Sequence, residues 1–186
     1  VSTIGPLQAA HKSWWDAATG YAYLSGISPG WRGQHLIVYD LKNPYQPKFV
    51  CNWGLPGQRP GDPQAGGYLG LHHPVISGNR AYLSYLQGGD MVVLDITDKA
   101  NPKIISHLDF SPPFSGIHTT VPFSGMKVPN FTPGFGDVRN FLVVAEEAMD
   151  AQYRCQEVRT QLYIVDATEE TNPLPIATFK VPDGDF

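Results

Sequence analysis

MVVLDITDKANPKIISHLD, residues 91–109, contains the pattern that decides the fold. A short apolar run ends at an aspartate, a turn closes with Asn-Pro, and a second apolar run follows. The pattern occurs twice more, as HLIVYDLKNPYQPKFV from residue 35 and as QLYIVDATEETNPLPIATFKV from residue 161. Because internal repetition is the signature of a repeat architecture, the chain is predicted to contain three copies of one structural unit.

The apolar runs LIVY, MVVL and LYIV are short, rich in β-branched residues and closely bounded by turn residues, which favours strands over helices. They do not alternate apolar with polar residues, so both faces of these strands are expected to be buried. Asp40, Asp95 and Asp166 end the three runs and are interpreted as turn residues, because aspartate bonds its own backbone. The proline of each Asn-Pro pair then ends the pairing between strands.

Each unit is predicted to contain four strands, with a hairpin after the second and the Asn-Pro turn after the third. The units span residues 11–53, 70–110 and 116–181 of a single domain over 1–186. Four-stranded units buried on both faces are typical of an all-β fold, the β-propeller, in which blades pack around a channel. Because three blades do not close a ring, the remaining blades are expected to come from another chain segment or from other subunits.

Two long stretches rich in Gly and Pro, residues 54–67 and 124–137, are predicted to be loops. The segment 149–159 is predicted to be a polar hairpin connection. The sequence GISPG at residues 26–30 matches the G-x-S-x-G pattern, but a strand rather than a helix is expected to follow, so we interpret it as a hairpin loop.

Composition excludes several function classes. The formal net charge is −4, only 16% of residues are charged and Lys and Arg do not cluster, which argues against nucleic-acid binding. No apolar run approaches the ~20 residues of a membrane span. No glycine-rich nucleotide-binding motif occurs, so no nucleotide cofactor is expected. Cys51 and Cys155 are either free thiols or one disulfide, and the Asn130–Thr132 sequon matters only in a eukaryotic secretory context.

The stretches LIVYDLKNPYQP, MVVLDITDKANP and LYIVDATEETNP resemble the LVIVD repeat, which is found mainly in bacterial and archaeal surface or exported proteins. The resemblance covers most of the chain in three copies. It implies a β-propeller and an extracytoplasmic location, and it implies no single activity. More distantly, the chain is similar to the selenium-binding protein and methanethiol oxidase propellers, which carry histidines at the channel. No longer motif of that group matches, so none of its catalytic residues is carried over.

The histidines occupy related places in the repeat. Aligning GLHHPV (70–75) with GIHTTV (116–121) places His72 on His118, and His11 sits comparably, ahead of Trp14-Trp15 and the strand at Tyr21. The first strand of a blade lies at the channel, so these rings are expected to converge at one mouth. Neutral imidazoles suit Zn, Cu, Fe or Ni, and three ligands with an open position are typical of catalytic zinc.

The sequence therefore predicts a metal site of His11, His72 and His118, completed by His73 or by ligands from the missing blades. The alternative is that these histidines bond loop carbonyls and order the channel mouth. His35 and His107 lie elsewhere in the repeat and are expected at the surface.

Carboxylates end a strand of the third unit where the second unit has Leu86 and Gln87: they are Glu146, Glu147 and Asp150. Glu146 is the candidate acid or base, and a solvated strand end is the alternative. Several aromatic residues are candidates either for an apolar pocket or for the core between blades. They are Trp14, Trp15, Trp31, Trp53, Tyr82 and Tyr85.

Two functions follow as hypotheses. The first is a metal-binding propeller, or a metal-dependent enzyme, that acts on a small molecule at the channel mouth. The second is an extracytoplasmic scaffold that binds a protein or glycan through its long loops.

Overall fold

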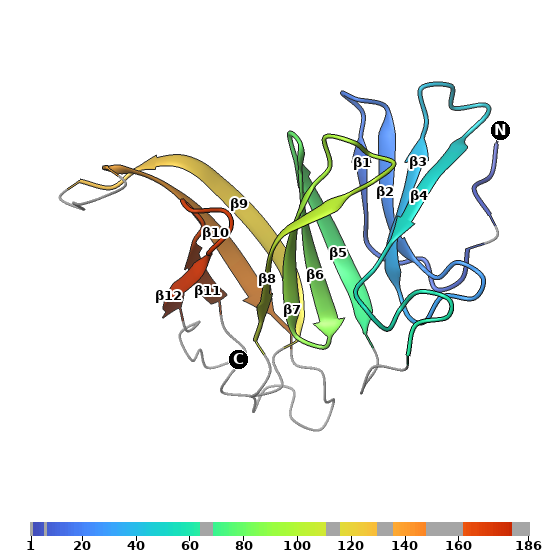
Figure 1. The fold of residues 1–186 in the computed structure, drawn as a ribbon. Helices are drawn as coiled ribbons and strands as arrows, with labels where there is room; N and C mark the ends of the chain where they lie inside the picture. The colour runs from blue at the N-terminus through green and yellow to red at the C-terminus, as the bar shows by residue number, and fades with distance from the viewer. Residues whose placement is uncertain are drawn as a thin grey trace, which may run out of the picture.

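The computed structural model describes residues 2–5, 7–63, 69–110, 116–129, 136–147 and 162–179, and these residues form strands and no helix (Figure 1). The all-β prediction is therefore confirmed. Asp150, Cys155, the Asn130–Thr132 sequon and the predicted hairpin connection at 149–159 lie outside the described residues. The described part of the chain has no helix long and apolar enough to cross a membrane.

The strands form three four-stranded antiparallel sheets, each with its strands in chain order. The first sheet contains β1 (Ser13–Asp16), β2 (Tyr21–Gly26), β3 (His35–Asp40) and β4 (Lys48–Trp53). The second contains β5 (Gly70–Ser77), β6 (Arg80–Gln87), β7 (Asp90–Asp95) and β8 (Lys103–Asp109). The third contains β9 (Ile117–Lys127), β10 (Val138–Glu146), β11 (Leu162–Asp166) and β12 (Leu174–Phe179).

The turn residues of the repeat behave as the sequence predicts. The Oδ1 atoms of Asp40, Asp95 and Asp166 each accept a hydrogen bond from the backbone N–H two residues later, at 2.8, 2.8 and 2.9 Å. This local bond bends the chain out of the third strand of each sheet. The hairpin between β6 and β7 uses Gly88 and Gly89, whose φ angles of 112° and 77° lie in the region that glycine tolerates.

The three sheets repeat one another down to single positions. In each sheet, four residues that pair across the four strands form a row, and one such row occupies the same place in all three sheets. The first, second and third rows are Trp14–Tyr23–Val38–Cys51, Val75–Tyr82–Val93–Ser106 and Val121–Val143–Ile164–Ala177. Beside each row the pairing of the fourth strand skips one residue, which is Val50, Ile105 or Ile176. Such shared bulges mark a true structural repeat.

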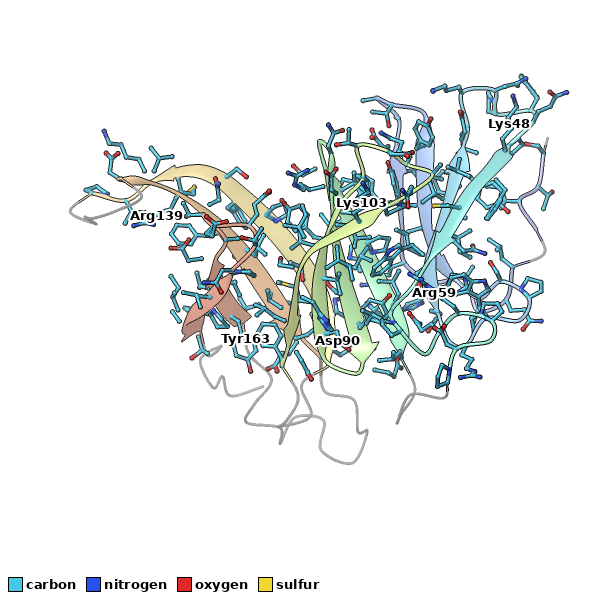
Figure 2. The ribbon with its side chains drawn as sticks, viewed as in Figure 1. Lys48, Arg59, Asp90, Lys103, Arg139 and Tyr163 are labelled. Atoms are coloured by element: carbon cyan, nitrogen blue, oxygen red, sulfur yellow. The ribbon has the colours of Figure 1, made fainter. Side chains whose placement is uncertain are left out.

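Adjacent sheets pack face to face, and side chains fill the space between them (Figure 2). The first row faces the second sheet and the second row faces the third sheet, so Tyr23 and Val93 are buried. The other face of the first sheet is covered by Ile4 and Leu7. Apolar side chains remain exposed on the third sheet, among them Val121 in the third row.

A glutamine joins the first long loop to the seam between the first two sheets. Gln58 is 1% exposed. Its Nε2 donates to the carbonyl oxygens of Gln34 at 2.8 Å and Leu69 at 3.2 Å. Its Oε1 accepts from the Leu55 backbone N–H at 3.0 Å and from the Tyr85 hydroxyl at 3.1 Å. The loop that the sequence predicts at 54–67 is thus anchored, over its described residues, by a buried side chain.

Three expectations are corrected. The predicted loop at 124–137 is wrong at its start, because β9 continues to Lys127, which pairs with Val138, so the β9–β10 hairpin extends beyond the other strands (Figure 1). The LYIV run is not buried on both faces; only Val165 in it is buried, because no sheet formed by the described residues covers the outer face. His35 is fully buried rather than at the surface, because its ring stacks on Trp31 with centroids 4.1 Å apart.

Candidate metal centre

Two of the predicted histidines sit at β-bulges in equivalent strands. In β5, Leu71 pairs with Tyr85 and His73 with Ser84, so His72 is the extra residue. In β9, Ile117 pairs with Glu146 and Thr119 with Ala145, so His118 is the extra residue. A bulge turns its extra side chain out of the regular alternation and is common beside functional sites. The repeat therefore aims both imidazoles in the same way from adjacent sheets.

The third histidine reaches the same point from the first sheet. His11 lies just before β1, where its backbone N–H donates to the Ser25 carbonyl at 3.0 Å. Its Nε2 is 2.8 Å from Nε2 of His72, and the two ring centroids are 4.5 Å apart. The rings of His72 and His118 are 4.2 Å apart. The three predicted rings thus converge, because β5 packs against both β1 and β9.

Hydrogen-bond partners assign the tautomers of two rings. Nδ1 of His72 lies 3.1 Å from the carbonyl oxygen of His118, which can only accept, so this nitrogen carries the proton. Nε2 of His118 lies 3.0 Å from the Lys12 ammonium, which can only donate, so this nitrogen carries the lone pair. The Nδ1–H of His118 then donates to Thr119 Oγ1 at 2.6 Å. Nε2 of His72 therefore also carries a lone pair, and it accepts from the Nε2–H of His11, 2.8 Å away.

Burial keeps these rings neutral. Desolvation, together with the neighbouring His118, His11 and Lys12, lowers the pKa of His72 to about 4, against an opposing bond to the His118 carbonyl. Desolvation also lowers the pKa of His118, as does Lys12, while Glu147 opposes the change. A lowered pKa leaves the imidazole lone pair available at neutral pH, which is the form that binds a metal ion.

A carboxylate completes the group. Oε2 of Glu147 lies 3.8 Å from Nε2 of His118. The potential ligand atoms of His72, His118 and Glu147 all lie within 4.8 Å of one another. Two imidazoles and a carboxylate are a known ligand set for zinc and other first-row metals. A metal-binding histidine usually donates its second ring nitrogen to a carbonyl, carboxylate or water oxygen, and His72 does so.

The structure places the remaining candidates differently. His73 points its Nδ1 at Thr119 Oγ1, 3.2 Å away, and is not part of the group of close ligand atoms. Glu146 accepts a hydrogen bond from the Tyr163 hydroxyl at 3.2 Å, so the carboxylate beside the histidines is its neighbour Glu147. The sequence also offered no reason to single out Lys12. Lys12 follows His11, and the equivalent positions of the other two units hold His73 and Thr119, so the repeat gives no pattern that marks a lysine here.

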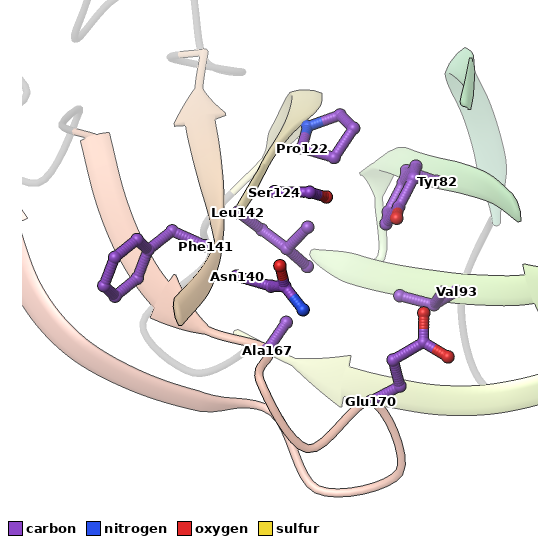
Figure 3. A pocket seen from close by; sticks show the side chains of 9 residues that line it. All are labelled: Tyr82, Val93, Pro122, Ser124, Asn140, Phe141, Leu142, Ala167 and Glu170. Carbon is purple, nitrogen blue, oxygen red and sulfur yellow. The ribbon is translucent and has the colours of Figure 1, made fainter. Parts of the chain in front are cut away.

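The aromatic candidates do not form one pocket. Trp53 and Tyr85 are core residues, Trp14 is half-buried between the two main apolar clusters, and Trp15 is 61% exposed. The best-defined pocket among the described residues lies between the second and third sheets and encloses about 340 Å³, part of it open solvent (Figure 3). Of the predicted aromatic residues only Tyr82 lines it.

Two polar side chains of this pocket, Glu170 and Asn140, already have partners. Glu170 is held by Arg80, with Nε–Oε1 and Nη2–Oε2 distances of 3.0 and 2.9 Å. The Asn140 side chain accepts from the Gly125 backbone N–H at 2.9 Å. No histidine lines the pocket. Within the described residues, the histidine cluster is therefore the stronger candidate for chemistry.

Comparison of the chain with protein-family models and with curated proteins found no match.

Proposed function

We propose that the chain binds a divalent transition metal through His72, His118 and Glu147, with His11 beside this group, and presents it to a small molecule. One observation carries the proposal: the potential ligand atoms of two imidazoles and one carboxylate, those of His72, His118 and Glu147, lie within 4.8 Å of one another. Histidine nitrogens with one carboxylate suit Zn, Cu, Fe or Ni better than calcium or magnesium. The alternative, that the histidines only order loops, accounts for the bond between His72 and the His118 carbonyl but not for the grouping of both rings with Glu147.

Native mass spectrometry tests this proposal directly. The purified chain, stripped with a chelator and dialysed against Zn²⁺ or Co²⁺, is expected to retain one metal ion per chain. Bound metal should raise the unfolding temperature, because it binds the folded state and not the unfolded state. A chain that retains no stoichiometric metal in the presence of excess ion contradicts the proposal.

We further propose that the three sheets are blades of a β-propeller of the LVIVD-repeat kind. The equivalent rows, the shared bulges and the repeated face-to-face packing support this architecture. The site would then lie where the first strands of successive blades meet. No observation on the described residues favours the alternative of a loop-binding scaffold, whose loops lie in part outside them.

The third row supports a place for a further blade. Val121, Val143 and Ile164 belong to the third row. The equivalent row of the second sheet is covered by the third sheet, yet Val121 is 38% exposed. An apolar face that is buried at each earlier step of the repeat is expected to carry another sheet of the same repeat. Exposed apolar patches of this kind drive association.

The isolated chain is therefore expected to self-associate through this face. Val121→Glu places a charge in the row and should shift sedimentation toward the monomer, because burying an unpaired carboxylate is costly. Tyr45→Glu is the matched control, since Tyr45 is 78% exposed in an Asn-Pro turn away from the face. A wild-type chain that sediments as a monomer, or equal assembly of both variants, contradicts the proposal.

A further inference from the structure

The histidine cluster contains one ammonium that metal ligation alone does not explain. Lys12 follows His11 and places its Nζ 3.0 Å from Nε2 of His118. This is the nitrogen whose lone pair a metal ion would use. Since a single lone pair cannot serve both, binding of a metal at His118 displaces the ammonium from this nitrogen. The flexible lysine stem keeps the charge beside the centre, where it needs a new acceptor.

The charges around the cluster do not cancel. The charge of Lys12 lowers the pKa of His72, His73 and His118. Among the described residues, Glu147 is the only carboxylate that shifts the pKa of any of these three rings. The imidazoles are neutral ligands. A divalent ion, one carboxylate and one ammonium therefore leave a net positive charge beside the buried His72 ring, with Lys12 and Glu147 exposed. An anion stabilises such a charge, and more strongly near a protein surface than in bulk water.

We infer that the metal centre takes an anionic oxygen ligand, a carboxylate or a phosphate, held between the metal ion and the Lys12 ammonium. The inference rests on the proposed metal binding and names the class of small molecule that the site accepts. The metal ion bonds one oxygen of the anion, and the displaced ammonium donates to another. Lys12 acts here as a positioning residue for the anion and not as a metal ligand.

Cobalt spectroscopy tests the inference. The chain loaded with Co²⁺ is titrated with acetate and, separately, with inorganic phosphate, and the visible absorption of the metal reports each binding constant. Lys12→Met keeps the length of the side chain and removes its charge. It is expected to weaken binding of the anions by about 10-fold or more, since a hydrogen bond to a charged group contributes about 1.5–3 kcal/mol. Lys12→Arg keeps the charge and should retain most of the affinity.

Two controls separate this inference from the metal proposal. Lys12→Met should bind Co²⁺ at least as tightly as the wild type, because it loses a competitor for the His118 lone pair. Imidazole, a neutral nitrogen ligand, should bind both proteins alike. Anion affinities that are equal in the wild type and Lys12→Met overturn the inference and leave the metal site standing. Failure of the wild type to load Co²⁺ overturns both. The acetate and phosphate titrations show which anion the site prefers.

Discussion

His72→Ala and His118→Ala are each expected to lower metal affinity by more than about 100-fold, because even the loss of a group that hydrogen-bonds a metal ligand costs about 10–100-fold. Each substitution removes one of the two imidazoles whose potential ligand atoms lie within 4.8 Å of each other and of Glu147. Equilibrium dialysis with Zn²⁺ measures the effect. The wild type should also gain about 2.7 kcal/mol of unfolding free energy at a metal concentration 100 times the dissociation constant, and the variants should lose this gain.

The matched control for this experiment is His73→Ala. His73 neighbours His72 on β5 and is half-buried, but its nitrogen points at Thr119 rather than at the ligand group. It should keep most of the metal affinity. Unfolding of all variants in the presence of a chelator shows whether a loss of metal merely reflects a loss of folding. Equal metal affinity in His73→Ala and His72→Ala would contradict the assignment of ligands.

Gln58→Leu is expected to destabilise the chain by about 3 kcal/mol or more, since each buried polar group left without a partner costs about 1–3 kcal/mol. The side chain satisfies two buried donors and the carbonyls of Gln34 and Leu69 at once. Leucine has similar volume and no polar atom, so it leaves these groups without partners in the seam between the first two sheets. Urea unfolding followed by tryptophan fluorescence measures the change.

Gln46→Leu is the control for that change, because Gln46 is exposed in the first Asn-Pro turn. Its unfolding free energy should lie close to that of the wild type. If Gln58→Leu also unfolds near the wild-type urea concentration, the glutamine does not anchor the loop as described. An unchanged slope of the urea transition would show that the comparison concerns one cooperative unit.

Gln58 also shows where prediction from sequence ends. A glutamine in a stretch rich in Gly and Pro looks like an ordinary loop residue, and its burial depends on backbone carbonyls of Gln34 and Leu69. His35 was misplaced for a related reason, because its burial follows from stacking on Trp31 in a loop. Neither contact leaves a periodic signal: the His35 stack depends on the conformation of a loop, and the Gln58 bonds depend on where separate segments pack.

The repeat, by contrast, could be read from local chemistry. Asp40, Asp95 and Asp166 each bend the chain through a bond to a backbone N–H two residues away, and such a bond needs no tertiary partner. Four strands per unit, their order and the alignment of His72 with His118 follow from the same short-range pattern. For this reason the all-β fold and three of the candidate ligands were predictable from the amino-acid sequence alone.

The carboxylate and the tautomers depended on packing between sheets. Glu146 and Glu147 are adjacent and chemically alike. A bulge in β9 lies opposite Glu146, and β10 ends at that residue. This geometry brings Glu147, rather than Glu146, beside His118. Lys12 meets His118 across 106 positions of sequence. Local sequence thus specified the turns and strands, because their energetics lie within a few residues. The identity of the site came from sheet packing, because contacts across sheets depend on the position of every strand between them.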